Sequence, residues 1–158
     1  MGPKPPFPGG DEGSLSHENP QESPIPYLRA SFPDPFPPMS SFQELGLRAE
    51  ILRALQELGF SAPTPVQESA VPVLLTSEED VVVLAQTGTG KTAAFGLPLL
   101  EDIDPQERGV QALVLAPTRE LCVQITGDFE KFAKHLPGVK PVAVYGGASI
   151  REQMRSIQ

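Results

Sequence analysis

The chain has no tryptophan, a single cysteine and only two histidines among its 158 residues. One cysteine excludes an intramolecular disulfide, and so few cysteines and histidines give no zinc-ligand pattern. No apolar run is long enough to cross a bilayer, and no apolar secretory segment follows the first residues. We therefore expect a cytoplasmic protein that does not contact a membrane.

Positive charge is also scarce. The chain carries 12 lysines and arginines against 20 aspartates and glutamates, for a net charge of −8. This balance argues against a surface that coats nucleic acid broadly through electrostatic attraction. Any contact with nucleic acid must be local, and must be made by a few donors such as loop amides and one or two arginines.

Proline, by contrast, is abundant and unevenly placed. Residues 1–38 hold 11 of the 19 prolines, few aliphatic residues and no helical or alternating periodicity. Such a composition predicts a disordered extension, because it offers too little apolar surface to offset the entropy lost on ordering. We expect the folded domain to occupy residues 39–158.

The most informative stretch is Val81-Val-Val-Leu-Ala-Gln-Thr-Gly-Thr-Gly-Lys-Thr92. Its apolar start predicts a buried strand, and its glycines allow backbone N–H groups to converge on an anion at the start of a helix. Lys91 would neutralise the outer phosphates of a nucleotide, and the Thr92 hydroxyl would hold Mg²⁺. Ala85 stands where the Walker pattern has its first glycine, so an ordinary glycine-rich turn is the alternative.

Around this stretch, strands and helices alternate. Apolar spacing predicts helices over residues 48–58, 65–75, 91–100 and 118–136, and a further helix that begins after Ser149. Apolar runs predict buried strands over residues 81–84, 112–116 and 141–145. The alternation over residues 81–158 predicts a parallel α/β sheet with flanking helices.

Three features allow both a structural and a functional interpretation. Thr64 and Gln67 form a capping box, but a glutamine amide also matches the edge of an adenine base. Thr118 is a good N-cap after the second strand, at the sheet end where open α/β folds bind ligands. The paired Gly146 and Gly147 make a turn, or admit a phosphate backbone closely.

Taken in order, these stretches resemble the amino-terminal half of the DEAD-box ATP-dependent RNA helicases. The resemblance covers about residues 41–158. It is carried by Phe42, Gly59-Phe-Ser-Ala-Pro-Thr-Pro-Val-Gln67, Ala85-Gln-Thr-Gly-Thr-Gly-Lys-Thr92, Pro117-Thr-Arg-Glu-Leu121 and Gly146-Gly147. In that family Ala85 is an ordinary first residue of motif I.

The resemblance implies a RecA-like P-loop sheet, an incomplete first helicase domain, and an enzyme that couples ATP hydrolysis to local RNA unwinding. It implies that Phe60 stacks on adenine, Gln67 reads it, and Lys91 and Thr92 serve catalysis with Mg²⁺. The implied nucleotide-binding residues are Phe60, Gln67, Ala85, Gln86, Thr87, Gly88, Thr89, Gly90, Lys91 and Thr92. The implied RNA-binding residues are Pro117, Thr118, Arg119, Gly146 and Gly147, which would contact the backbone without regard to sequence.

The family's Asp-Glu-Ala-Asp motif and its second RecA-like domain do not occur in these 158 residues. We therefore expect this stretch to bind ATP without hydrolysing it. The alternatives are a different P-loop ATPase, such as a DNA helicase, and a fragment that binds nucleic acid without catalysis.

Overall fold

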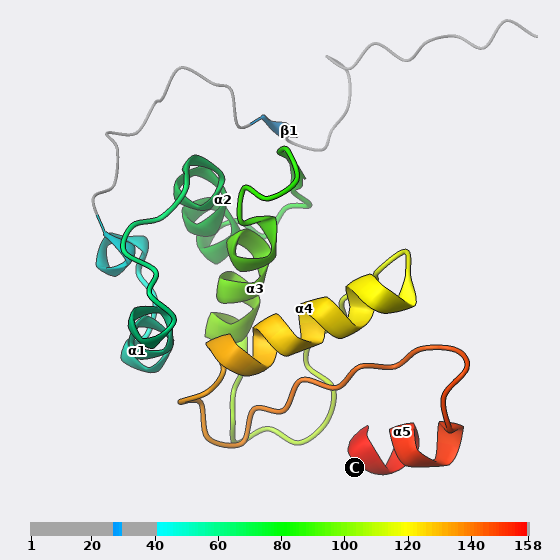
Figure 1. The fold of residues 1–158 in the computed structure, drawn as a ribbon. Coiled ribbons are helices and arrows are strands. Elements are labelled where there is room, and N and C mark those ends of the chain that lie inside the picture. The colour runs from blue at the N-terminus through cyan, green and yellow to red at the C-terminus, as the bar shows by residue number, and fades with distance from the viewer. Residues whose placement is uncertain (1–26, 30–40, 158) are drawn as a thin grey trace, which may run out of the picture.

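The computed structural model describes residues 27–29 and 41–157 (Figure 1). Its elements are β1 (Tyr27–Arg29), a 3₁₀ helix η1 (Phe42–Leu45), α1 (Ala49–Glu57), α2 (Pro65–Thr76), β2 (Val82–Leu84), α3 (Lys91–Asp102), α4 (Arg119–Phe132) and α5 (Ile150–Ile157). The five predicted helices and the strand before the phosphate loop are confirmed. The helix predicted over residues 118–136 is shorter, because α4 ends at Phe132.

The described sheet has two strands. β1 pairs with β2 in parallel, with Tyr27 opposite Val82 and Arg29 opposite Leu84. The prediction that residues 1–38 lack regular structure is therefore wrong at Tyr27–Arg29, and the rest of that segment lies outside the described residues. Three residues are too few to display an alternating pattern, yet pairing with the edge of β2 satisfies backbone groups of both strands.

The strands predicted over residues 112–116 and 141–145 are wrong within the described part of the chain. Both segments run without backbone-to-backbone hydrogen bonds to another described residue. Their apolar residues predict burial on two faces, but only one face is covered. Val114 packs against the core, whereas Leu113 and Leu115 are 76% and 84% exposed.

The core forms where the helices meet. α3 packs against α2 and α4, and α1 packs against α4. In Figure 1, α4 crosses α3, while α5 lies apart at the end of an extended segment. The main cluster of buried side chains comprises Phe42, Leu45, Leu47, Ile51, Leu55, Val71, Ala93, Leu97, Leu100, Phe129, Phe132, Ala133 and Leu136.

A paired contact joins the start of α1 to the end of α3. The Arg48 backbone N–H donates to Glu101 Oε2 at 2.7 Å, and Arg48 Nε donates to Glu101 Oε1 at 3.2 Å. This partly buried pair helps to fix α1 beside the helix that follows the phosphate loop. The longest described helix, α4, has 14 residues, and none of the described helices could span a bilayer.

Candidate nucleotide and RNA site

The phosphate-loop residues leave β2 at Leu84 and enter α3 at Lys91. Gly88 and Gly90 have φ angles of 79° and 87°, a left-handed backbone that favours glycine. A Cβ atom at Gly90 would lie 2.4 Å from Gln67 Nε2. Position 90 therefore requires glycine for two reasons, its left-handed backbone and the close approach of the Gln67 side chain.

The capping box at the start of α2 holds this loop. The Thr64 backbone N–H donates to Gln67 Oε1 at 2.9 Å, which completes the predicted box. From the same two residues, Thr64 Oγ1 donates to the Thr89 carbonyl at 2.9 Å and Gln67 Nε2 donates to the Gly90 carbonyl at 3.2 Å. Gln67 is 1% exposed, so the structural interpretation of this residue is confirmed.

Lys91 begins α3 and turns back over the loop. Its Nζ donates to the carbonyl oxygen of Ala85 at 2.6 Å, and also to that of Gln86. The ammonium group therefore lies within the loop that would surround phosphate oxygens. Thr89 Oγ1 donates to the Gln86 carbonyl at 2.8 Å, which adds a second bond across the same turn.

Thr92 follows in the first turn of α3, and its hydroxyl is the kind of oxygen ligand that Mg²⁺ accepts. The described residues contain no group of three or more His, Cys, Asp or Glu side chains that could hold a metal ion. Thr92 supplies a single oxygen ligand, so a Mg²⁺ ion at this position would need further oxygens, such as those of nucleotide phosphates.

Phe60 follows α1 and lies between two other rings. Its ring centroid is 5.9 Å from that of Phe42 and 6.1 Å from that of Phe132, both in edge-on geometry. Phe60 is 37% exposed, so part of the ring remains open to a ligand. Phe42 and Phe132 thus both lie against the Phe60 ring, and the contact with Phe132 was not predicted from the sequence.

The predicted RNA-binding residues come together on an exposed surface. Thr118 caps α4, because its Oγ1 accepts from the Leu121 backbone N–H at 3.2 Å. The Arg119 guanidinium lies over the Tyr145 ring at 4.6 Å, and a Cβ atom at Gly147 would lie 3.8 Å from one of its nitrogens. Pro117 and Gly146 are exposed beside these residues.

Tyr145 was not predicted from the sequence to be a neighbour of this site. The residue directly precedes Gly146 at the end of an apolar run, so it resembles an ordinary strand residue. Its proximity to Arg119, which lies 26 positions earlier in the chain, depends on tertiary structure.

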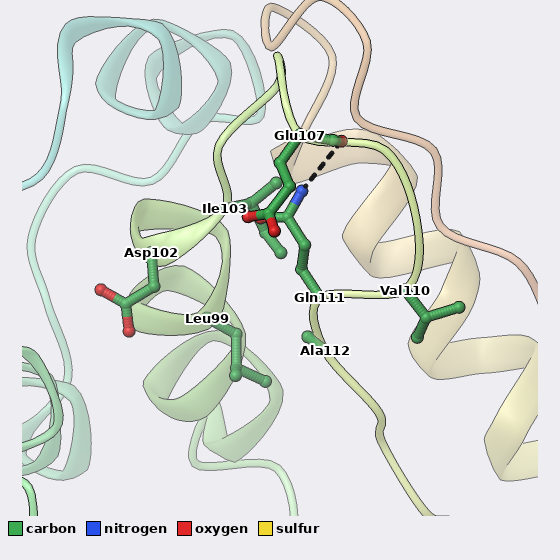
Figure 2. Close-up of a pocket in the computed structure, with 7 residues that line it drawn as sticks. All are labelled: Leu99, Asp102, Ile103, Glu107, Val110, Gln111 and Ala112. Atoms are coloured by element: carbon green, nitrogen blue, oxygen red, sulfur yellow. Dashed lines mark hydrogen bonds between the residues drawn. The ribbon is translucent and has the colours of Figure 1, made fainter.

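A separate hollow of about 390 Å³ lies between the C-terminal end of α3 and the loop after it (Figure 2). It is lined by Leu99, Asp102, Ile103, Glu107, Val110, Gln111 and Ala112. The Gln111 side chain bonds the loop's own backbone, with Nε2 donating to the Asp104 and Glu107 carbonyls. None of the predicted site residues lines this hollow.

Comparison with known proteins places these motifs in a family. The family model described as DEAD/DEAH box helicase matches residues 64–158. The chain is 51% identical over 119 residues to "ATP-dependent RNA helicase DeaD" of Klebsiella pneumoniae. The aligned residues make up 75% of this chain and 18% of that protein. The chain thus spans less than two thirds of the relatives it matches.

Solved structures agree with the family match. Helicase Prp28 from Chaetomium thermophilum, bound to ADP, is 42% identical with a TM-score of 0.65, over 75% of this chain and 30% of that one. Dbp5 L327V from S. cerevisiae, bound to RNA and ADP BeF3, is 38% identical with a TM-score of 0.60. This match covers 62% of this chain and 25% of the Dbp5 chain. These neighbours confirm the RecA-like α/β class. Because the family model covers more than half of its length, the chain belongs to the DEAD/DEAH box helicase family.

Proposed function

We propose that this chain forms the ATP-binding part of an ATP-dependent RNA helicase. The observation that carries the proposal is the position of Lys91, whose ammonium group lies against the carbonyls of a glycine loop at the N-terminus of α3. A lysine, loop amides and a helix N-terminus together favour a polyphosphate. Because the chain spans 18% of the length of one such helicase, unwinding belongs to the whole protein.

At the nucleotide, Lys91 binds the outer phosphates and the amides of residues 85–90 surround the inner ones. Thr92 would hold Mg²⁺ together with the phosphates, and the bound ion would supply charge neutralisation at the phosphate oxygens. Phe60 stacks on adenine with its exposed part. The Gln67 side chain bonds the backbone through one lone pair of Oε1 and one N–H of Nε2. Its second lone pair and second N–H bind the edge of the adenine base.

RNA binds across the N-terminus of α4 and the turn at Gly146. Arg119 donates charge-assisted hydrogen bonds to a phosphate, while Pro117, Thr118, Gly146 and Gly147 contact the backbone closely. Such contacts position a strand and do not select its sequence. This mode suits a chain whose net charge is −8, because a few placed donors are enough.

The functional unit is a RecA-like domain over residues 39–158 of a cytoplasmic protein, with residues 1–38 as an extension. These 158 residues contain no Asp-Glu-Ala-Asp motif. The stretch by itself therefore binds ATP and does not turn it over.

Titration calorimetry with MgATP tests the proposal. Lys91→Ala is expected to weaken ATP binding by about tenfold or more, since a charge-assisted bond to phosphate is worth about 1.5–3 kcal/mol. Lys140→Ala removes the same charge from an exposed position outside the site and should leave the affinity unchanged. If ATP binds equally well to wild type and Lys91→Ala, the proposed nucleotide site is refuted.

The proposed contacts of Phe60 and Gln67 with adenine are tested separately, by comparing the affinities for ATP and GTP. Wild type should prefer ATP over GTP, and Phe60→Ala should reduce ATP affinity. Equal affinity for the two nucleotides would remove the adenine role while leaving the phosphate site intact.

A further inference from the structure

The Arg119 guanidinium lies over the Tyr145 ring. The guanidinium carbon lies 4.6 Å from the Tyr145 ring centroid, within the range of a cation–π contact. Arg119 is exposed and the described residues provide no acidic partner for it. The aromatic ring is therefore the group that fixes the guanidinium in place.

Tyr145 is itself held by a residue of α5. The Gln153 side chain bonds both backbone groups of Tyr145: Oε1 accepts from the Tyr145 N–H at 2.8 Å, and Nε2 donates to the Tyr145 carbonyl at 3.1 Å. A neighbouring strand would satisfy these groups in a sheet, and here a single amide side chain does so. The contact fixes the backbone of Tyr145, although this segment forms no backbone-to-backbone hydrogen bonds with another described residue.

We propose that Tyr145, held by Gln153, is a positioning residue that orients Arg119 toward an RNA phosphate. This inference rests on the proposed RNA contact of Arg119. A cation–π contact uses no acceptor oxygen, so the guanidinium N–H groups remain available to form the fork that pairs with phosphate oxygens. Gly147 lies beside the same guanidinium, and a side chain there would approach it at 3.8 Å.

The orientation matters because positive charge is scarce in this protein. A flexible arginine loses side-chain entropy when it binds, and one that lies over a ring has lost part of that entropy already. Tyr145 therefore contributes to RNA affinity without touching the phosphate. The hydroxyl group has no part in this contact, so phenylalanine should replace tyrosine and leucine should not.

Fluorescence anisotropy with a labelled single-stranded oligouridine tests the proposal at one fixed salt concentration. Tyr145→Leu is expected to weaken binding about twofold to fivefold, the range of an exposed cation–π contact. Tyr145→Phe should bind as wild type does. In an Arg119→Ala background, Tyr145→Leu should have no further effect, because the ring would have no guanidinium to orient.

The outcomes separate this inference from the proposed function. If Arg119→Ala leaves RNA affinity unchanged, the proposed RNA contact fails, and the inference fails with it. If Arg119→Ala weakens binding but Tyr145→Leu does not, only the inference is overturned. Equal losses in Tyr145→Phe and Tyr145→Leu would also overturn it, because they would assign the effect to the hydroxyl.

A measurement on the unaltered chain avoids dependence on how the variants fold. The Arg119 side-chain protons should show upfield ring-current shifts in the NMR spectrum of wild type and of Tyr145→Phe. Gln153→Ala should reduce both these shifts and the RNA affinity. Unshifted Arg119 protons in wild type would show that the contact with the Tyr145 ring does not exist in solution.

Discussion

The side-chain nitrogen of Gln67 lies 3.2 Å from the carbonyl oxygen of Gly90, so the residue that caps α2 also fixes the end of the phosphate loop. The other end of the same amide accepts from Thr64, and the whole side chain is buried. The geometry of the start of α2 and that of the loop are consequently coupled. A change at either position should affect both helix stability and nucleotide binding.

Gln67→Ala should lower the free energy of unfolding by about 1–3 kcal/mol, because the Thr64 N–H and the Gly90 carbonyl both lose a buried partner. Urea unfolding measures this change. Gln56→Ala removes the same side chain from an exposed position of α1 and should alter stability by less than about 0.5 kcal/mol. Equal effects of the two substitutions would contradict the importance of the Gln67 contacts.

Gly90→Ala should destabilise the chain and weaken ATP binding. A left-handed backbone costs a residue with a Cβ atom about 1–2 kcal/mol, and here the new atom would also lie 2.4 Å from Gln67 Nε2. Gly46→Ala is the matched control, since its φ is 80° and nothing lies within 4 Å of an added Cβ. Urea unfolding and titration with MgATP should show a larger loss at Gly90 than at Gly46. Equal stability losses and unchanged ATP affinity would refute the steric argument.

The helices and the phosphate loop could be predicted because their signals are local. Thr64, Pro65 and Gln67 specify a helix start within four residues. Apolar spacing predicted the helix over residues 48–58, and its Ile51 and Leu55 are buried. Leu58 fits the same spacing but is 39% exposed, because α1 ends at Glu57 and the chain turns away there.

The strands over residues 112–116 and 141–145 could not be predicted correctly, because a strand requires partners that its own sequence does not specify. Their apolar residues indicate burial, but burial depends on which segments lie alongside. Pairs that link distant segments, such as Arg119 with Tyr145 and Lys134 with Glu57, could not be predicted from the sequence for the same reason. Their members are separated by 26 and 77 positions.

Gly96→Ala should destabilise the chain although glycine is a poor helix former. α3 and α4 cross at this residue, and an added Cβ atom would lie 2.8 Å from the Phe129 ring. Overpacking of this kind costs about 1–3 kcal/mol, more than the gain of about 0.5–1 kcal/mol in helix propensity. Gly127→Ala lies in α4 with nothing within 4 Å of an added Cβ, so it should stabilise the chain by about that gain. Thermal unfolding followed by circular dichroism compares the two variants, and stabilisation by both would disprove the close approach at Gly96.

Glu57, the last residue of α1, pairs with the segment that follows α4. Lys134 Nζ donates to Glu57 Oε2 at 2.7 Å, and His135 Nε2 lies 3.0 Å from Oε1, out of line for a hydrogen bond. Arg53 adds a longer contact of 3.4 Å from the preceding turn. The hydrogen bond from Lys134, together with the nearby His135, lowers the pKa of Glu57 from about 4.5 to about 2.

Stability should therefore depend on the ionisation of Glu57. Because the folded-state pKa lies below the unfolded value, Glu57 stabilises the fold at pH values above about 4.5, and this contribution is lost as the pH falls toward about 2. In urea unfolding at pH about 6 and about 3, wild type should lose more stability than Glu57→Gln, which has no carboxylate to protonate. Glu130→Gln neutralises an exposed carboxylate of α4 and should follow wild type. If Glu57→Gln and wild type lose the same amount between the two pH values, the pair with Lys134 does not stabilise the folded chain.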